Sequence, residues 1–230
     1  MWNRQELKEK AKMAFKANYW KTVAVSVLLL IVGGGAGLYT ISNNNSSSSE
    51  ATAQLSGLSQ GEMIAVILAV LGGIAAVGTI MFVIKLLLLD PLTVGCQKFF
   101  KENAEFPADF SEIGAGFRTK YGNVVLTMFL QNLFLGLWTL LFIIPGIVKA
   151  YSYRMVPYIL ADNPEMSSTD IITKSREMMN GHKWDAFVLD LSFLGWLILT
   201  ALTGGILGIF YVYPYIFETN AELYLALKND

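Results

Sequence analysis

Four charged residues stand within or at the ends of long apolar stretches of this sequence: Arg154, Asp190, Glu218 and Asp90. If those stretches are helices that cross a membrane, each charge costs about 2.5 kcal/mol or more to place there, so each needs a reason. A helix rises about 1.5 Å per residue, and on that count all four charges lie roughly 9–12 Å from the same membrane surface. These four residues are therefore the candidate site, an intramembrane polar cluster.

The role of this cluster depends on whether the four side chains contact one another in the folded protein. Our hypothesis is that Arg154 pairs with one or more of the three acids in the interior of the helix bundle. In the alternative, each charge reaches the lipid headgroups separately because its helix is tilted. If the cluster forms, it would make an inward-facing polar cavity that binds an anionic headgroup or a proton.

Residue types that catalyse reactions or bind metals are sparse. His182 is the only histidine, and it precedes Lys183 and Trp184 at the predicted membrane edge, where we expect a headgroup contact or a helix end. Cys96 is the only cysteine, so no internal disulfide or thiolate cluster can form. No glycine-rich phosphate loop of the P-loop type is present. We predict no catalytic residue, no metal site, no cofactor and no enzymatic activity.

The apolar content indicates which elements position these residues. Of the 230 residues, 54% are apolar and 15% are charged, and the mean hydropathy is +0.48. Soluble domains carry about 25% charged residues. The apolar runs are Thr22–Ile41, Ile64–Leu89, Val124–Ile144, Gly146–Leu160, Ala186–Thr203 and Ile206–Phe217. A run of about 18 residues or more can cross the hydrocarbon core as a helix, so the sequence predicts an all-α membrane protein, with two runs slightly short.

Lysine and arginine mark the cytoplasmic side of a membrane protein. Basic residues gather in segments 1–21, 98–120 and 162–184, whereas segment 41–61 holds none and is rich in serine and asparagine. Two crossings are needed between neighbouring basic segments, which predicts six spans with both termini in the cytoplasm. The alternative has five spans, with one long tilted helix after Trp184 and the C-terminus outside.

The six spans resemble three copies of one hairpin within a single membrane domain, 1–230. The pseudo-repeats cover about 1–100, 101–162 and 163–230, and the returning spans of the last two share Pro157 and Pro214. A proline removes one backbone hydrogen bond and kinks a helix. The alternative is that any amphipathic segment followed by an apolar one looks alike.

Each hairpin is preceded by a predicted amphipathic helix at the membrane surface. The apolar positions of these helices are Leu7, Ala11, Ala14 and Phe15, then Phe110, Ile113 and Phe117, then Ile171, Ile172, Met178 and Met179. Ser167 and Asp170 fit the start of the third helix as a cap, and Gly181 fits its end.

Four blocks of this sequence resemble a known family. They are Ile143–Tyr153, Pro157–Pro164, Ser175–Trp184 and Leu191–Trp196. They look like the "domain of unknown function 975" family of integral membrane proteins, found mainly in Gram-positive bacteria. The resemblance implies a cytoplasmic-membrane location and no settled activity. More distantly, the chain is similar to the membrane domain of some glycerophosphodiester phosphodiesterases, whose soluble catalytic domain is absent here, so their chemistry does not carry over.

Two functions of different classes follow from these features. In the first, the chain is a small transporter or lipid-handling protein with the polar cluster as its site. In the second, it is a scaffold or accessory protein in envelope homeostasis, and the buried charges only fix the packing. The expected partners are membrane lipids, with anionic headgroups attracted to the lysines of the first helix. The net charge of −1 gives no reason to expect nucleic acid.

Overall fold

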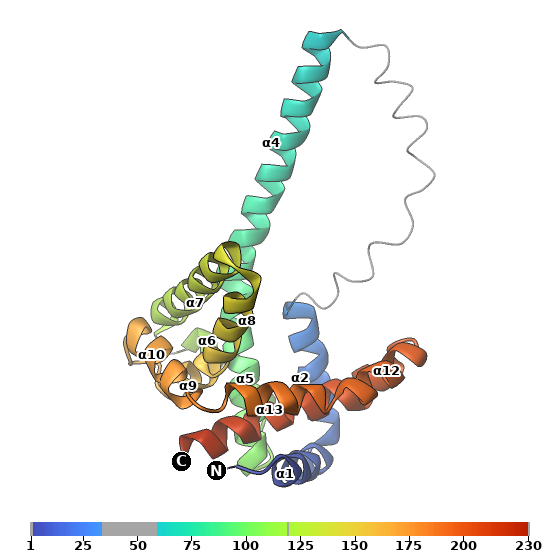
Figure 1. Ribbon diagram of the computed structural model, residues 1–230, viewed down its shortest axis with the longest axis vertical. Coiled ribbons are helices and arrows are strands. Elements are labelled where there is room, and N and C mark those ends of the chain that lie inside the picture. The colour runs from blue at the N-terminus through green and yellow to red at the C-terminus, as the bar shows by residue number, and fades with distance from the viewer. Residues whose placement is uncertain (1, 34–58, 119, 230) are drawn as a thin grey trace.

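The computed structural model describes residues 2–33, 59–118 and 120–229, and throughout these ranges the regular structure is helical (Figure 1). The helices are α1 (Arg4–Ala17), α2 (Tyr19–Val32), α4 (Gln60–Ile84), α5 (Asp90–Glu105), α6 (Ala115–Arg118), α7 (Tyr121–Leu141), α8 (Ile143–Ser152), α9 (Val156–Asp162), α10 (Ser168–Met178), α11 (Lys183–Leu191), α12 (Leu194–Leu202) and α13 (Tyr213–Lys228). The prediction of an all-α protein is confirmed for the described residues.

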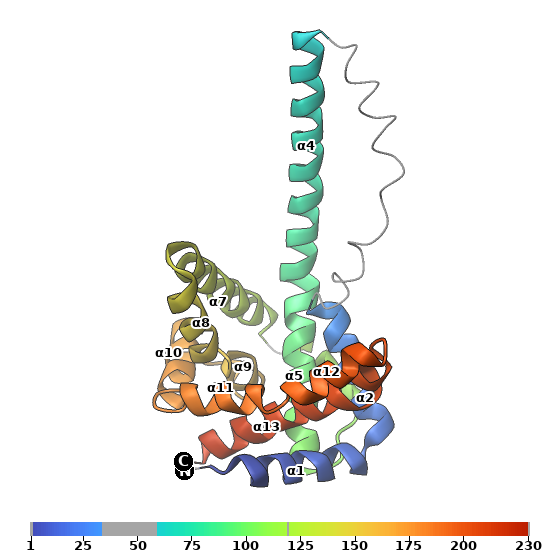
Figure 2. The ribbon, with the colours of Figure 1, turned by 45° about the vertical axis from the view of Figure 1, so that its right-hand side comes forward.

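Helix α4 continues through a π-helical turn, Lys85–Leu89, into α5, so that one helical rod runs from Gln60 to Glu105. Its α4 half is apolar on every side and has no buried residue, which is typical of a helix surrounded by lipid. Figure 2 shows α4 rising out of the molecule while the other helices gather around α5. The rod therefore joins an apolar helix, of the kind that lipid surrounds, to the packed part of the protein.

Three helical segments are long and apolar enough to cross a membrane: Gln60–Glu105, Tyr121–Leu141 and Lys183–Leu202. A fourth is counted if α1 and α2, which meet at 106°, form one span. The described part of the chain thus carries three to four candidate spans, which suggests membrane association. The predicted first run, 22–41, lies partly outside the described residues, and so does most of the predicted external loop, 41–61.

The predicted fourth run is a broken helix, and the sixth contains a π-helical turn. The fourth divides into α8 and α9 at the turn 153–155, and the sixth passes through a second π-helical turn, Gly208–Val212, before α13. Pro157 and Pro214 each occupy the first turn of the helix that follows, as Pro91 does in α5. Proline lacks an amide hydrogen and is tolerated there because the first N–H groups of a helix have no partner within it. The three prolines share this local geometry, while six spans and the threefold repeat remain predictions.

The packed core forms where α1, α5, α9 and α13 meet. Leu7, Ala11 and Phe15 are buried on the predicted apolar face of α1, which packs along α13. In both ribbon views the beginning of α1 and the end of α13 lie side by side (Figures 1 and 2). This end of the molecule positions the sites described below.

Candidate functional site

The four predicted site residues occupy three separate places. The structure brings Arg154 and Asp190 together, whereas Glu218 lies in the core between other helices and Asp90 lies at the start of α5. Pairing with Arg154 is therefore seen for Asp190, and the contacts of Glu218 and Asp90 are made with other residues.

Arg154 and Asp190 form a two-pronged ion pair. The guanidinium of Arg154, in the turn between α8 and α9, donates to both carboxylate oxygens of Asp190 in α11, at 2.8 and 2.7 Å. The Tyr151 hydroxyl donates to the same carboxylate at 2.9 Å, and the side-chain oxygen of Asn220 accepts from Arg154 at 2.6 Å. Parallel charge-assisted bonds of this kind are strong and geometrically specific. The arrangement fastens the turn to α11 and α13 and leaves few of its bonding positions open to a ligand.

Asp90 is held by a lysine of its own helical rod. The ammonium of Lys85 lies 2.8 Å from the buried Asp90 carboxylate, and the amide of Asn132 in α7 donates to it at 3.2 Å. The sequence analysis did not predict the pairing of Lys85 with Asp90. The π-helical turn brings residues five apart onto one face, and that turn is not evident from the sequence.

Glu218 is the fully buried member of the set, and only one of its oxygens is satisfied. Asn103 of α5 donates to Oε1 at 2.6 Å, and the Thr22 hydroxyl donates to the same oxygen at 3.4 Å. Among the described residues, Oε2 is buried and has no hydrogen-bond partner. An unsatisfied buried carboxylate oxygen is costly, so its presence points to a bound proton or ligand group.

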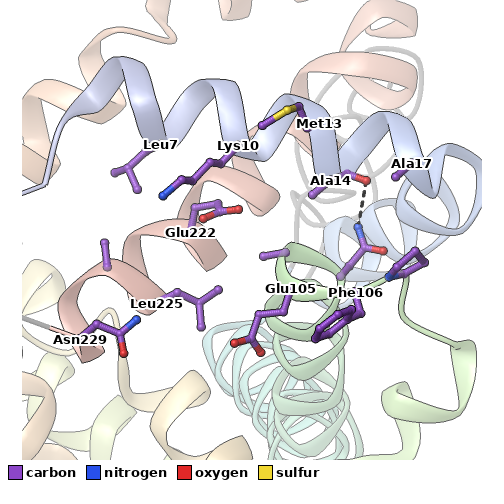
Figure 3. Close-up of a pocket in the computed structure, with 14 residues that line it drawn as sticks. Leu7, Lys10, Met13, Ala14, Ala17, Glu105, Phe106, Glu222, Leu225 and Asn229 are labelled. Carbon is purple, nitrogen blue, oxygen red and sulfur yellow. Dashed lines mark hydrogen bonds between the residues drawn. The ribbon is translucent and has the colours of Figure 1, made fainter.

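Asn103 connects Glu218 to a cavity of about 580 Å³. The cavity lies between α1, the end of α5 and α13, and its volume is in the range of small-molecule sites. Figure 3 shows its charged lining: Lys10 from α1, Glu222 from α13 and Glu105 from α5. The dashed bond in Figure 3 joins the Asn103 amide to the Ala14 carbonyl at 3.3 Å. Asn103 therefore belongs both to the cavity wall and to the Glu218 contact.

Asp162 ties three helices together at the same end of the molecule. Its carboxylate in α9 accepts from Lys101 at 2.8 Å, from Lys228 at 2.6 Å and from the Tyr224 hydroxyl at 2.8 Å. Burial raises the pKa of the Asp162 carboxyl, but these hydrogen bonds outweigh burial and hold the pKa below its ordinary value. Sequence reasoning missed this junction because its members are 61 to 66 positions from Asp162.

The residue types that could bind a metal do not gather in the described ranges. Across residues 2–33, 59–118 and 120–229, no group of three or more histidine, cysteine, aspartate or glutamate side chains is arranged to hold an ion. Cys96 is buried in α5, and the imidazole of His182 lies near the indole of Trp2, with 6.4 Å between the ring centroids.

Comparison with known proteins gives one match. The model of a family described as a protein of unknown function, DUF975, matches residues 119–230, which contain Arg154, Asp190 and Glu218. Searches of curated proteins and of solved structures found nothing that matches the chain. The matched range includes the stretch in which the resemblance is most specific, Ile143–Trp196. Over residues 119–230, the chain is therefore similar to the DUF975 family of proteins of unknown function.

Proposed function

We propose that this chain is a non-enzymatic, multi-pass protein of the cytoplasmic membrane that acts as a small transporter or lipid-handling protein. The proposed site is the cavity lined by Asn103, Lys10 and Glu222, with Glu218 buried behind Asn103. The observation that carries the proposal is a fully buried carboxylate with one unpartnered oxygen, joined through Asn103 to a cavity of about 580 Å³. A proton, or a donor group of a bound solute, is the natural partner of that oxygen.

Glu218 replaces Arg154 as the centre of the proposed site. The bonds of Arg154 and Asp190 are directed at each other and at two neighbouring side chains, so a ligand would have to displace them. Glu218 keeps one oxygen without a partner, so a proton or ligand group that reaches it has no existing hydrogen bond of that oxygen to break.

The basic residues of α1 give the proposed orientation. Lys10 lines the cavity, and the lysine-rich N-terminal segment is the strongest cytoplasmic signal in the sequence. The cavity would then face the cytoplasm, with both termini on that side and the exposed lysines of α1 close to anionic headgroups. Six segments would enter the membrane as three hairpins, and the fourth would be a broken helix, a feature common around transporter sites.

The second candidate function is a membrane scaffold or accessory protein in envelope homeostasis. The Arg154–Asp190 pair favours this function. Its hydrogen-bonding positions are already occupied within the protein, so the pair fixes the packing of the helices and does not bind a ligand. Under this function the Glu218 cavity would hold only water or a proton.

Replacing Glu218 with glutamine tests the proposal. Glutamine keeps the oxygen that accepts from Asn103 and changes only the unpartnered atom, so the fold should survive. Lipids and metabolites that co-purify with the full chain would be measured by mass spectrometry. We expect a compound bound to the wild type to fall roughly tenfold in Glu218→Gln, as for the loss of one charge-assisted hydrogen bond.

Glu165→Gln is the matched control, because Glu165 is an exposed glutamate that pairs with Lys120 outside the cavity. It should retain the compound at the wild-type level. Identical small-molecule profiles for the wild type and Glu218→Gln, with both proteins folded, would favour the scaffold and remove the proposed site.

A further inference from the structure

A second polar cavity, of about 300 Å³, lies between α8, α10 and the start of α11. Its lining residues are Lys149, Ser152, Thr173, Arg176, Glu177, Asn180 and Lys183. Three cations therefore face one space with a single carboxylate among them. Like charges repel at such distances, so this arrangement is favourable only if an anion or solvent lies between them.

The charged donors of this cavity are not engaged in ion pairs. Over the ranges that the structure describes, Lys149, Arg176 and Lys183 make no ion pair, and the side chains of Thr173 and Asn180 make no hydrogen bond. By contrast, Lys101 and Arg154 nearby in the fold are bound to carboxylates. The cavity thus gathers three cations that no ion pair occupies, beside one carboxylate, that of Glu177.

The cavity also borders an exposed apolar surface. Ile147 and Val148, beside Lys149, are 52% and 46% exposed, and Trp184, beside Lys183, is 71% exposed. The ammonium of Lys149 lies 4.7 Å from the centre of the Trp138 ring. Tryptophan is enriched where the hydrocarbon core meets the headgroups. The cavity therefore borders a surface of the composition found where a protein meets lipid headgroups.

We propose that this cavity binds a phosphate group. Arginine presents parallel donors that match phosphate oxygens, lysine adds compact positive charge, and the threonine and asparagine side chains add neutral donors. The group is carried either by an anionic lipid headgroup or by a soluble phosphate ester. This site rests on observations separate from those at Glu218, so either can fail without the other.

Arg176→Gln tests the site, and Lys174→Gln is its control. Both residues are exposed on α10 and carry the same charge, but only Arg176 lines the cavity. The detergent-solubilised full chain would be titrated with phosphatidylglycerol, read out by native mass spectrometry, and separately with glycerol 1-phosphate, read out by calorimetry. We expect Arg176→Gln to weaken binding about tenfold, and Lys174→Gln to leave it within about twofold, because charge-assisted bonds act only at contact.

The two probes distinguish the source of the phosphate. An Arg176-dependent loss with phosphatidylglycerol alone assigns the site to a lipid headgroup, and the same loss with glycerol 1-phosphate shows that the phosphate group suffices. If neither probe binds the wild type, or if Lys174→Gln weakens binding as much as Arg176→Gln, the proposal is overturned.

Discussion

Replacing Arg154 with methionine is expected to lower the free energy of unfolding by about 2–3 kcal/mol. The change removes the guanidinium that satisfies both Asp190 oxygens and leaves Tyr151 as the remaining donor. Breaking a buried ion pair costs about 3–5 kcal/mol, and we expect less here because the Asp190 side chain is 38% exposed. Denaturant unfolding in detergent, followed by near-ultraviolet circular dichroism, measures the difference.

The charge-reversed double variant is the control for this prediction. Arg154→Asp combined with Asp190→Arg keeps opposite charges at the two positions and should recover part of the lost stability, as a double-mutant cycle would show. The corresponding exchange between Arg154 and Glu218 should recover none, because Glu218 contacts Asn103 and Thr22 instead. If Arg154→Met and the wild type have the same free energy of unfolding, the ion pair is open to solvent and does not stabilise the fold.

Gly95→Ala is expected to have the second large effect, a loss of about 3 kcal/mol or a failure to fold. A side-chain carbon at Gly95 of α5 would overlap the backbone carbonyl of Ile113, and one at Gly116 would overlap the carbonyl of Pro91. Backbone atoms cannot relieve the overlap by changing rotamer, as a flexible side chain can. The two glycines therefore allow α5 to lie directly against the segment 110–118, and thermal unfolding of the purified variant tests this.

Gly136→Ala supplies the matched comparison. Gly136 lies within α7, and nothing approaches the position of its missing side chain within 4 Å. Alanine is the better helix former, so this variant should be neutral or more stable by up to about 1 kcal/mol. If Gly95→Ala and Gly136→Ala unfold at the same temperature, the close approach of α5 to 110–118 is wrong.

The sequence indicated how far along its helix each charged residue lies, but not which direction its side chain faces around the helix axis. Arg154 and Asp190 were grouped because each lies a similar distance from a cytoplasmic helix end, and the structure brings them together. The same argument grouped Glu218 and Asp90 with them, but distance along a helix does not fix which neighbour a side chain faces. Lys85 shows this limit, because only the π-helical turn turns it toward Asp90.

Local signals predicted helix ends well. The Ser167 hydroxyl accepts from the amide of Asp170 at 3.3 Å, and Gly181 has the positive φ of 83° that a helix end requires. The breaks at 153–155 and 192–193 carry no glycine or proline within them and were not predicted. They depend on tertiary packing, which a single sequence does not encode locally.

Clusters built from distant positions were beyond the sequence. Asp162 joins α5, α9 and α13 through partners 61 to 66 positions away in the sequence. The cavity lined by Lys149, Arg176 and Lys183 likewise combines residues of three helices, α8, α10 and α11. No spacing rule links these residues, because the contacts arise from how the helices cross.

The central claim, that the basic segments and the Glu218 cavity face the cytoplasm across a membrane from segment 41–61, is tested most directly by labelling introduced cysteines. Cys96 is buried and would be replaced by serine, and single cysteines would be placed at Ser47 and at the exposed Ser111. In intact cells, a membrane-impermeant maleimide should label Ser47→Cys alone, with Ser111→Cys labelled only after the membrane is opened. Labelling of both positions from the same side would contradict the account.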